Sequence, residues 1–244
     1  MRVRLYGFTI SNPSQTARLM LDYKGVEPQV VNLLPGLHPA LLWMRGFRNG
    51  TVPAMRLDGR RVEGSREIAR ALERAVPEPP LFPADPEARR AVEEAEAWGE
   101  AELQNVPRRM VRWVLARDNG ARTRVAKEVG VPLPALAGAL NWPIARAMAA
   151  RVDADEAHVR QTLADLPATL DRVDRYLADG VIGGERPNAA DFQIAPSVRI
   201  LAGMADLAPL LAGRPCEEHA RRFVPRYPAA PPMLPRDMLA LAGL

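Results

Sequence analysis

The chain has 244 residues, of which 48% are hydrophobic and 25% charged, a balance that allows a buried core and one or two domains. The formal net charge is +4, but acidic and basic residues are interleaved, which argues against a nucleic-acid-binding face. A single cysteine excludes a disulfide framework, and no apolar run approaches the ~20 residues that span a bilayer. We therefore expect a cytoplasmic protein with no nucleic-acid and no membrane partner.

The first 76 residues alternate between strand and helix patterns. Turn and cap residues separate the segments: Lys24-Gly25 ends a helix, Asp58-Gly59 predicts a hairpin, and Ser65 begins a helix. The predicted elements, in chain order, are a strand at 3–8, a helix from 12 to 24, a strand at 28–34, a loop with a short irregular helix at 35–50, strands at 52–57 and 60–63, and a helix at 65–76. A βαβ unit followed by a hairpin predicts a mixed four-stranded sheet with helices packed on it.

Residues 77–86 contain five prolines in ten positions, which no regular element tolerates, so we place a linker there. After the linker every periodic segment is helical. We expect helices at 87–113 with a break at Pro107, at 117–129, 134–151 and 153–178, and from Asn188-Ala-Ala-Asp191 to Leu201. The sequence thus predicts an α+β chain with three parts: a thioredoxin-like domain at 1–76, a Pro-rich linker at 77–86 and an all-helical bundle at 87–244.

Several of these segments together resemble soluble glutathione transferases of the serine type from bacteria. The matching motifs, in order, are Leu5-Tyr6-Gly7, Ser11-Asn12-Pro13-Ser14, Thr51-Val52-Pro53-Ala54, Ser65-Arg66-Glu67-Ile68, Leu81-Phe82-Pro83 and Asn188-Ala-Ala-Asp191. The resemblance is close over the first third of the chain and loose over the remainder. It implies a glutathione-binding enzyme that forms a homodimer and acts in detoxification in the cytoplasm.

Ser11 is the catalytic residue that the resemblance implies, with Asn12 beside it. The residue follows the first strand and precedes a helix N-terminus, where free N–H groups and a partial positive charge stabilise an anion. A hydroxyl that donates to a bound thiolate lowers the pKa of that thiol. The alternative is a simple helix cap. Ser14 stands where redox relatives carry a second cysteine, so disulfide exchange is excluded.

Thr51, Val52 and Pro53 form the second binding element, whose proline is cis in the family. A cis peptide turns the chain at the start of a strand and leaves the backbone N–H and C=O of Val52 open to an extended peptide such as glutathione. An ordinary proline on an edge strand is the alternative.

Gly64 and Ser65 form the third binding element. In the family the serine holds the γ-glutamyl carboxylate of glutathione, and the preceding residue is Glu, Gln or Asp, which receives the α-amino group. Here that residue is Gly64, the most serious departure from the family pattern. Glu63 is the nearest carboxylate that could replace it. Otherwise the ligand binds weakly or is another thiol.

The second substrate, an electrophilic small molecule, is expected between the two domains. Candidates for an apolar wall are Phe8, Trp43, Met110 and Trp113, although such residues more often belong to a core. Three histidines occur singly without metal-ligand spacing, so no metal is expected. Cys216 lies beside Glu217, which disfavours a thiolate, so this thiol is expected to be inert.

Two functions remain open. The first is an enzyme that activates glutathione or a related thiol for conjugation to an electrophile. The second is a non-catalytic binding or structural protein of the same fold that has lost thiol activation, an alternative that Gly64 motivates.

Overall fold

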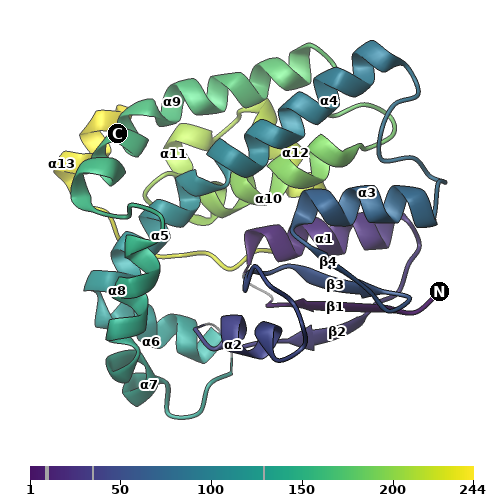
Figure 1. Cartoon of the computed structure of the whole chain (residues 1–244). Coiled ribbons are helices and arrows are strands. Elements are labelled where there is room, and N and C mark those ends of the chain that lie inside the picture. Colours follow the sequence, from purple (N-terminus) through teal and green to yellow (C-terminus); the bar gives the residue numbers. More distant parts are fainter. Residues whose placement is uncertain (9–10, 35, 129) are drawn as a thin grey trace. The chain divides into compact units, whose positions relative to one another are not determined.

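The computed structural model describes residues 1–8, 11–34, 36–128 and 130–244 (Figure 1). The first residue of the expected 35–50 loop and the last of the expected 117–129 helix lie outside these ranges. The chain divides into two compact units. Unit 1 comprises Met1–Gln104, Arg172–Ile200 and Gly213–Tyr227, and unit 2 comprises Asn105–Asp171, Leu201–Ala212 and Pro228–Leu244.

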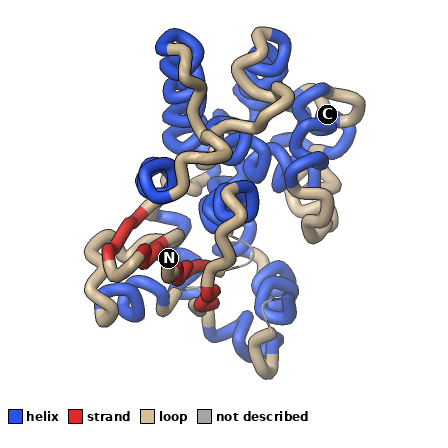
Figure 2. The backbone as a smooth tube through the Cα atoms, turned by 90° about the vertical axis from the view of Figure 1, so that its right-hand side faces the viewer, coloured by secondary structure: helices blue, strands red, loops and turns tan. Residues whose placement is uncertain are grey.

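A four-stranded sheet forms the centre of unit 1 (Figure 2). Its strands are β1 (Val3–Gly7), β2 (Gln29–Asn32), β3 (Ala54–Leu57) and β4 (Arg60–Glu63), in the order β2-β1-β3-β4. Only the β1–β2 pair is parallel, as the expected βαβ unit followed by a hairpin requires. Asp58 and Gly59 both have positive φ, 46° and 88°, which suits the tight turn between twisted strands.

Helices cover both faces of this sheet. Helices α1 (Asn12–Tyr23) and α3 (Ser65–Ala75) pack together on one face, and α2 (His38–Trp43) lies on the other (Figure 1). Side chains alternate accordingly along the strands. Tyr6 joins a buried cluster with Leu42 and Phe47 on the α2 side, and each such buried side chain contributes roughly 1.5–3 kcal/mol.

The linker after α3 is held by a buried ion pair. The Lys24 ammonium donates to Glu73 Oε2 at 2.6 Å and to the Val76 carbonyl oxygen at 2.6 Å. The same Glu73 oxygen accepts from the Leu81 N–H at 2.9 Å. Helix α4 (Pro86–Trp98) then starts where Asp85 caps it by accepting from the Ala88 N–H. The Pro-rich segment therefore has a defined course although it lacks regular structure.

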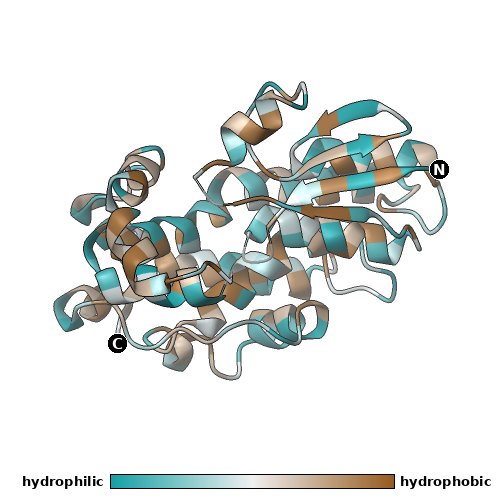
Figure 3. Cartoon of the chain, turned by 90° about the horizontal axis from the view of Figure 1, so that it is seen from below, coloured by the Kyte–Doolittle hydropathy of each residue, from teal (hydrophilic) through white to brown (hydrophobic). Residues whose placement is uncertain are grey.

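Unit 1 also contains a π-helical segment at Gly99–Leu103, α12 (Pro215–Phe223), and parts of two longer helices, α9 (Glu156–Ala178) and α10 (Ala189–Gly203), which also contribute to unit 2. Unit 2 further contains α5 (Asn105–Arg117), α6 (Asn119–Glu128), α7 (Pro134–Leu140), α8 (Trp142–Ala150), α11 (Ala208–Leu211), α13 (Arg236–Leu239) and a 3₁₀ turn at Ala240–Ala242. Hydrophobic and hydrophilic stretches alternate along these helices (Figure 3), as one-sided packing requires.

Two helix boundaries differ from the sequence prediction. The expected break at Pro107 occurs earlier, at the π-helical segment beginning at Gly99, where a Cβ would lie 3.0 Å from a Gln193 side-chain carbon. Pro107 lies in the first turn of α5, where a missing N–H costs nothing. The expected single helix at 134–151 is wrong, because it is divided at Asn141 just before Pro143. None of the described helices is long and apolar enough to cross a membrane.

Candidate functional site

Strand pairing brings the three sequence motifs to one end of the strands of the sheet. Tyr6 pairs with Ala54, and Ala54 pairs with Glu63. The residues after β1, before β3 and after β4 therefore leave the sheet at the same end of the strands. A hydrogen bond from the Gly64 N–H to the Pro53 carbonyl oxygen, at 3.0 Å, joins two of these segments. The starts of α1 and α3 and the turn before β3 thus gather within unit 1.

Ser11 precedes α1 and does not act as a side-chain cap. Its carbonyl oxygen accepts from the Gln15 N–H at 2.9 Å, but its hydroxyl makes no capping hydrogen bond. Because only 8% of the residue is exposed, that hydroxyl is held close to the helix N-terminus. Ser11 is therefore the N-cap residue by its backbone alone. Because a capping serine would accept through its oxygen, the O–H of Ser11 can donate to a ligand in either case, beside a partial positive charge.

Asn12 and Ser14 are buried parts of the first turn of α1. Asn12 Nδ2 donates to Ser197 Oγ at 2.8 Å, so this side chain attaches α1 to α10. Ser14 Oγ packs against Gly7, where a Cβ would come within 2.6 Å of it. The second hydroxyl of the Ser-x-x-Ser motif therefore serves packing.

The Val52–Pro53 peptide is cis. Thr51 is exposed and Val52 is half-buried. Within the described ranges, no backbone hydrogen bond engages the N–H or C=O of Val52. These groups form a short unpaired edge next to β3, which is what an extended peptide needs in order to bind as an added strand.

Glu63, the nearest carboxylate to Gly64, binds the loop before β3. Its two carboxylate oxygens accept from the backbone N–H groups of Arg48 at 2.9 Å and Asn49 at 2.8 Å. These bonds hold the loop that leads to Thr51, so the structure gives Glu63 a local structural role. Gly64 itself has φ of 94° and ψ of 148°, a conformation that favours glycine, and open space surrounds its Cβ position.

Ser65 starts α3 and is only 1% exposed. Its hydroxyl donates to Gln193 Oε1 at 3.0 Å. The backbone N–H groups of the first turn of α3 lack intrahelical partners and carry the positive end of the helix dipole. An anion can therefore be bound here by the backbone, while the serine hydroxyl is already engaged by α10.

Sequence reasoning missed the role of α10. Gln193 and Ser197 lie one turn apart on this helix and contact the first residues of α3 and α1, respectively. Both are buried, within a helix whose other residues are largely apolar. Two polar residues spaced i, i+4 on an apolar helix are the signal that could have revealed them. The capping box was predicted correctly, because Asn188 and Asp191 exchange hydrogen bonds at the start of this helix.

The four candidates for the apolar wall lie in different units and differ in exposure. Met110 is fully buried and Trp113 is 7% exposed, so both belong to the core of unit 2. In unit 1, Phe8 makes an edge contact with His38, and Trp43 is 74% exposed. Among the described residues, no group of three or more His, Cys, Asp or Glu side chains could hold a metal ion.

A thioredoxin-like domain with a small mixed sheet, followed by a mostly helical region, is the architecture of the glutathione transferases, and this chain has it. Residues 5–80 match the family model described as the N-terminal domain of glutathione S-transferase. The first third of the chain therefore matches the N-terminal domain of glutathione S-transferases, as the sequence motifs predicted.

Solved structures support the same fold over the whole length. Glutathione transferase F2 from Populus trichocarpa is 16% identical, covers 99% of both chains and has a TM-score of 0.62. A glutathione S-transferase from Sinorhizobium meliloti 1021 is 17% identical, with 99% of both chains covered and a TM-score of 0.60. The β-etherase LigF from a Sphingobium strain is 23% identical over 91% of this chain and 99% of its own, with a TM-score of 0.53. The sequence matches no curated protein.

Proposed function

We propose that this protein binds glutathione or a related thiol, activates it, and conjugates it to an electrophilic small molecule. The observation that carries the proposal is the position of the Ser11 hydroxyl at the start of α1, where it makes no capping hydrogen bond. The O–H of Ser11 can donate to a bound sulfur and so stabilise the thiolate form of a thiol whose pKa is ~8.5 when free. The thiol proton leaves to solvent, the thiolate sulfur forms a bond to the electrophilic carbon, and the bond from that carbon to its leaving group breaks, so that the leaving group departs with the electron pair.

The remaining site residues bind the thiol peptide in this proposal. Val52 pairs with the peptide backbone beside Thr51 and the cis Pro53, and Asn12 contributes its backbone N–H at the start of α1. Gly64 and Ser65 supply the N-terminus of α3 for a carboxylate. The unpaired backbone of Val52 and the free N–H groups of both helices support this assignment.

The catalytic role of Ser11 is tested with Ser11→Ala and with Ser14→Ala as its matched control. Both variants remove one hydroxyl from the same helical turn. Loss of a hydrogen bond to a charged group lowers kcat/KM by about 10–100-fold in Ser11→Ala and raises the apparent pKa of the bound thiol. Initial rates with glutathione and a generic aromatic electrophile across pH measure both effects. Equal activity in the wild type and Ser11→Ala would refute this role.

The alternative is a non-catalytic member of the same fold. It is favoured by Gly64, which carries no acidic side chain, and by the engagement of the Ser65 hydroxyl by Gln193. Calorimetric titration with glutathione separates the two functions. Saturation in the millimolar range or below supports the transferase, whereas a stable dimer without detectable thiol binding supports the alternative.

Three further assignments complete the proposal. The chain forms a homodimer, as the family resemblance implies, and works in the cytoplasm on electrophiles that require detoxification. Its thiol-binding domain comprises residues 1–76, the linker 77–86 and the helical domain 87–244. Limited proteolysis within the linker, followed by mass spectrometry, checks these boundaries.

A further inference from the structure

Two buried amide–hydroxyl pairs connect α10 to the helices of the proposed thiol site. At the start of α3, Ser65 Oγ donates to Gln193 Oε1 at 3.0 Å. At the start of α1, Asn12 Nδ2 donates to Ser197 Oγ at 2.8 Å. All four residues are buried and belong to unit 1. Helix α10 therefore contacts the first residue of each helix whose N-terminus the proposed function uses.

The Gln193 amide uses only one of its two polar ends. Its oxygen accepts from Ser65, but Nε2 is buried and has no hydrogen-bond partner among the described residues. The residue is only 1% exposed, so bulk water does not reach this group. A side-chain amide nitrogen carries two N–H donors, and leaving them buried without an acceptor is unfavourable. An arrangement that gives Nε2 an acceptor is therefore favoured.

A half-turn of this amide provides that acceptor. The turn exchanges the positions of Oε1 and Nε2 without changing the space that the side chain fills, and the last side-chain torsion of glutamine is broad. Nε2 then donates to Ser65 Oγ. Because a hydroxyl has one proton and two acceptor lone pairs, the Ser65 O–H is released to donate elsewhere. The aliphatic part of Gln193 stays in place, since its Cγ packs against Gly99, where a Cβ would lie 3.0 Å from it.

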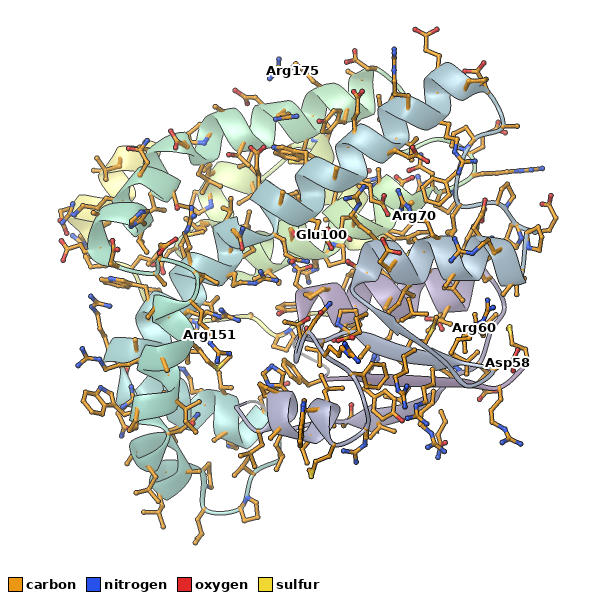
Figure 4. All side chains as sticks on the ribbon, in the orientation of Figure 1. Asp58, Arg60, Arg70, Glu100, Arg151 and Arg175 are labelled. Atoms are coloured by element: carbon orange, nitrogen blue, oxygen red, sulfur yellow. The ribbon has the colours of Figure 1, made fainter. Side chains whose placement is uncertain are left out.

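The arginines beside the start of α3 are already paired with acids. Arg66 pairs with Glu96 and Glu100, and Arg70 pairs with Glu96. Figure 4 labels Arg70 on α3 and Glu100 on the π-helical segment that follows α4. The donors that remain for a carboxylate at this helix N-terminus are the backbone N–H groups of the first turn and the Ser65 O–H.

We propose that Gln193 is a positioning residue that switches the Ser65 hydroxyl between α10 and the thiol ligand. Without ligand, the hydroxyl donates to Gln193 Oε1. When the carboxylate of the thiol peptide binds at the start of α3, the amide turns, Nε2 donates to Ser65 Oγ, and the Ser65 O–H donates to the carboxylate. The inference rests on the proposed function and adds a residue that selects thiols with a carboxylate at this position.

Calorimetric titration of the full-length protein with glutathione and with its 4-aminobutyryl analogue tests this role. The analogue lacks only the carboxylate of the γ-glutamyl group. We expect the wild type to bind the analogue about tenfold or more weakly, which corresponds to the loss of a charge-assisted hydrogen bond. Gln193→Glu replaces the amide with an acceptor of the same shape that, ionised at about pH 8, keeps the Ser65 O–H on α10. In this variant the preference for glutathione should fall about fivefold or more.

A double-mutant cycle with Ser65→Ala separates the switch from other effects of the new charge. If Gln193 acts through the Ser65 hydroxyl, Gln193→Glu changes the preference no further once Ser65→Ala has removed that hydroxyl. Repulsion by the new carboxylate persists in the Ser65→Ala background, and a merely structural change weakens the binding of both ligands equally. Either of these results would overturn the proposal. Ser197→Ala is the matched control, because it removes the hydroxyl of the other α10 pair and should leave the preference unchanged.

A measurement on the wild type keeps the test independent of whether Gln193→Glu folds, which circular dichroism verifies. The side-chain NH2 resonance of Gln193, assigned by its loss in Gln193→Met, should shift on saturation with glutathione and stay in place with the analogue. A resonance that does not respond to glutathione refutes the switch.

Failure of the proposed function gives a different result from failure of this inference. A wild type that binds no glutathione in the millimolar range overturns the proposed function and the role of Gln193 with it. A wild-type preference for glutathione that Gln193→Glu retains overturns the role of Gln193 alone.

Discussion

Gly64 is the residue that most limits thiol binding. Its positive φ and the open space around its Cβ position mean that a side chain there fits sterically but strains the backbone. Gly64→Glu restores the acidic group of the family pattern. We expect about 1–3 kcal/mol of destabilisation from the strained conformation, together with about tenfold tighter glutathione binding.

Gly59→Glu is the matched control for that variant. Gly59 also has positive φ and open space around its Cβ position. It lies in the β3–β4 turn, at the opposite end of these strands from the site. Melting temperature and calorimetric affinity measure the two effects. Tighter glutathione binding in Gly59→Glu as well, or none in Gly64→Glu, would contradict the assigned role of this position.

Cys216 was expected to be inert because Glu217 follows it, and the structure assigns a different cause. The thiol is fully buried, and burial together with Asp174 raises its pKa to about 12. Asp174 Oδ1 also accepts from the backbone N–H of Cys216 at 2.8 Å. Burial and the spatial neighbour Asp174, rather than the sequence neighbour Glu217, therefore suppress the thiolate of Cys216.

The raised pKa predicts how Cys216 responds to pH. The folded protein retains this proton up to about pH 12, whereas the unfolded chain releases it near the ordinary thiol pKa of 9.0. The resulting contribution to stability is present below pH 9 and is lost as pH rises from about 9 to 12. We expect slow labelling by a disulfide reagent in buffer and one fast equivalent in denaturant. Native labelling at the rate of free cysteine would refute this interpretation.

At the scale of elements, the Lys24–Glu73 pair determines the course of the linker. The Lys24 side chain is 0% exposed, and its ammonium binds both a carboxylate and linker carbonyl groups. Lys24→Met leaves Glu73 without its cation. We expect a loss of about 3 kcal/mol in the free energy of unfolding, measured as a lower urea midpoint.

The chain supplies a control for this variant, because it has only two lysines. Lys127 is exposed near the end of α6. Lys127→Met should shift the urea midpoint by no more than a surface substitution does, about 0.5 kcal/mol or less. A similar shift in both variants would show that the buried pair does not stabilise the linker.

At the scale of the whole molecule, the homodimer is the main prediction. The chain has a mass of 26.8 kDa, so light scattering after gel filtration should give about twice that value. Dilution through the micromolar range should leave the dimer intact, because lasting interfaces bury roughly 1,200–2,000 Å² or more. A mass of one chain at every concentration would contradict the predicted homodimer.

Local sequence determined the strands, the hairpin at Asp58-Gly59, the capping box at Asn188 and the starts of α1 and α3. Each depends on residues a few positions apart, such as turn glycines, caps and alternating apolar side chains, which act through the local backbone. The same patterns predicted the glutathione transferase fold. The early helix interruption at Gly99 was not predictable, because it coincides with the close approach of Gln193, which is 94 positions away.

Only the tertiary structure decided what the site residues touch. It showed that the Ser11 side chain makes no capping hydrogen bond, that Glu63 accepts from the backbone N–H groups of Arg48 and Asn49, and that Gln193 accepts from the Ser65 hydroxyl. Sequence patterns report the chemistry of side chains within a few residues of one another. The partners of a buried polar group come from distant elements, and only packing determines which of them lie within hydrogen-bonding distance.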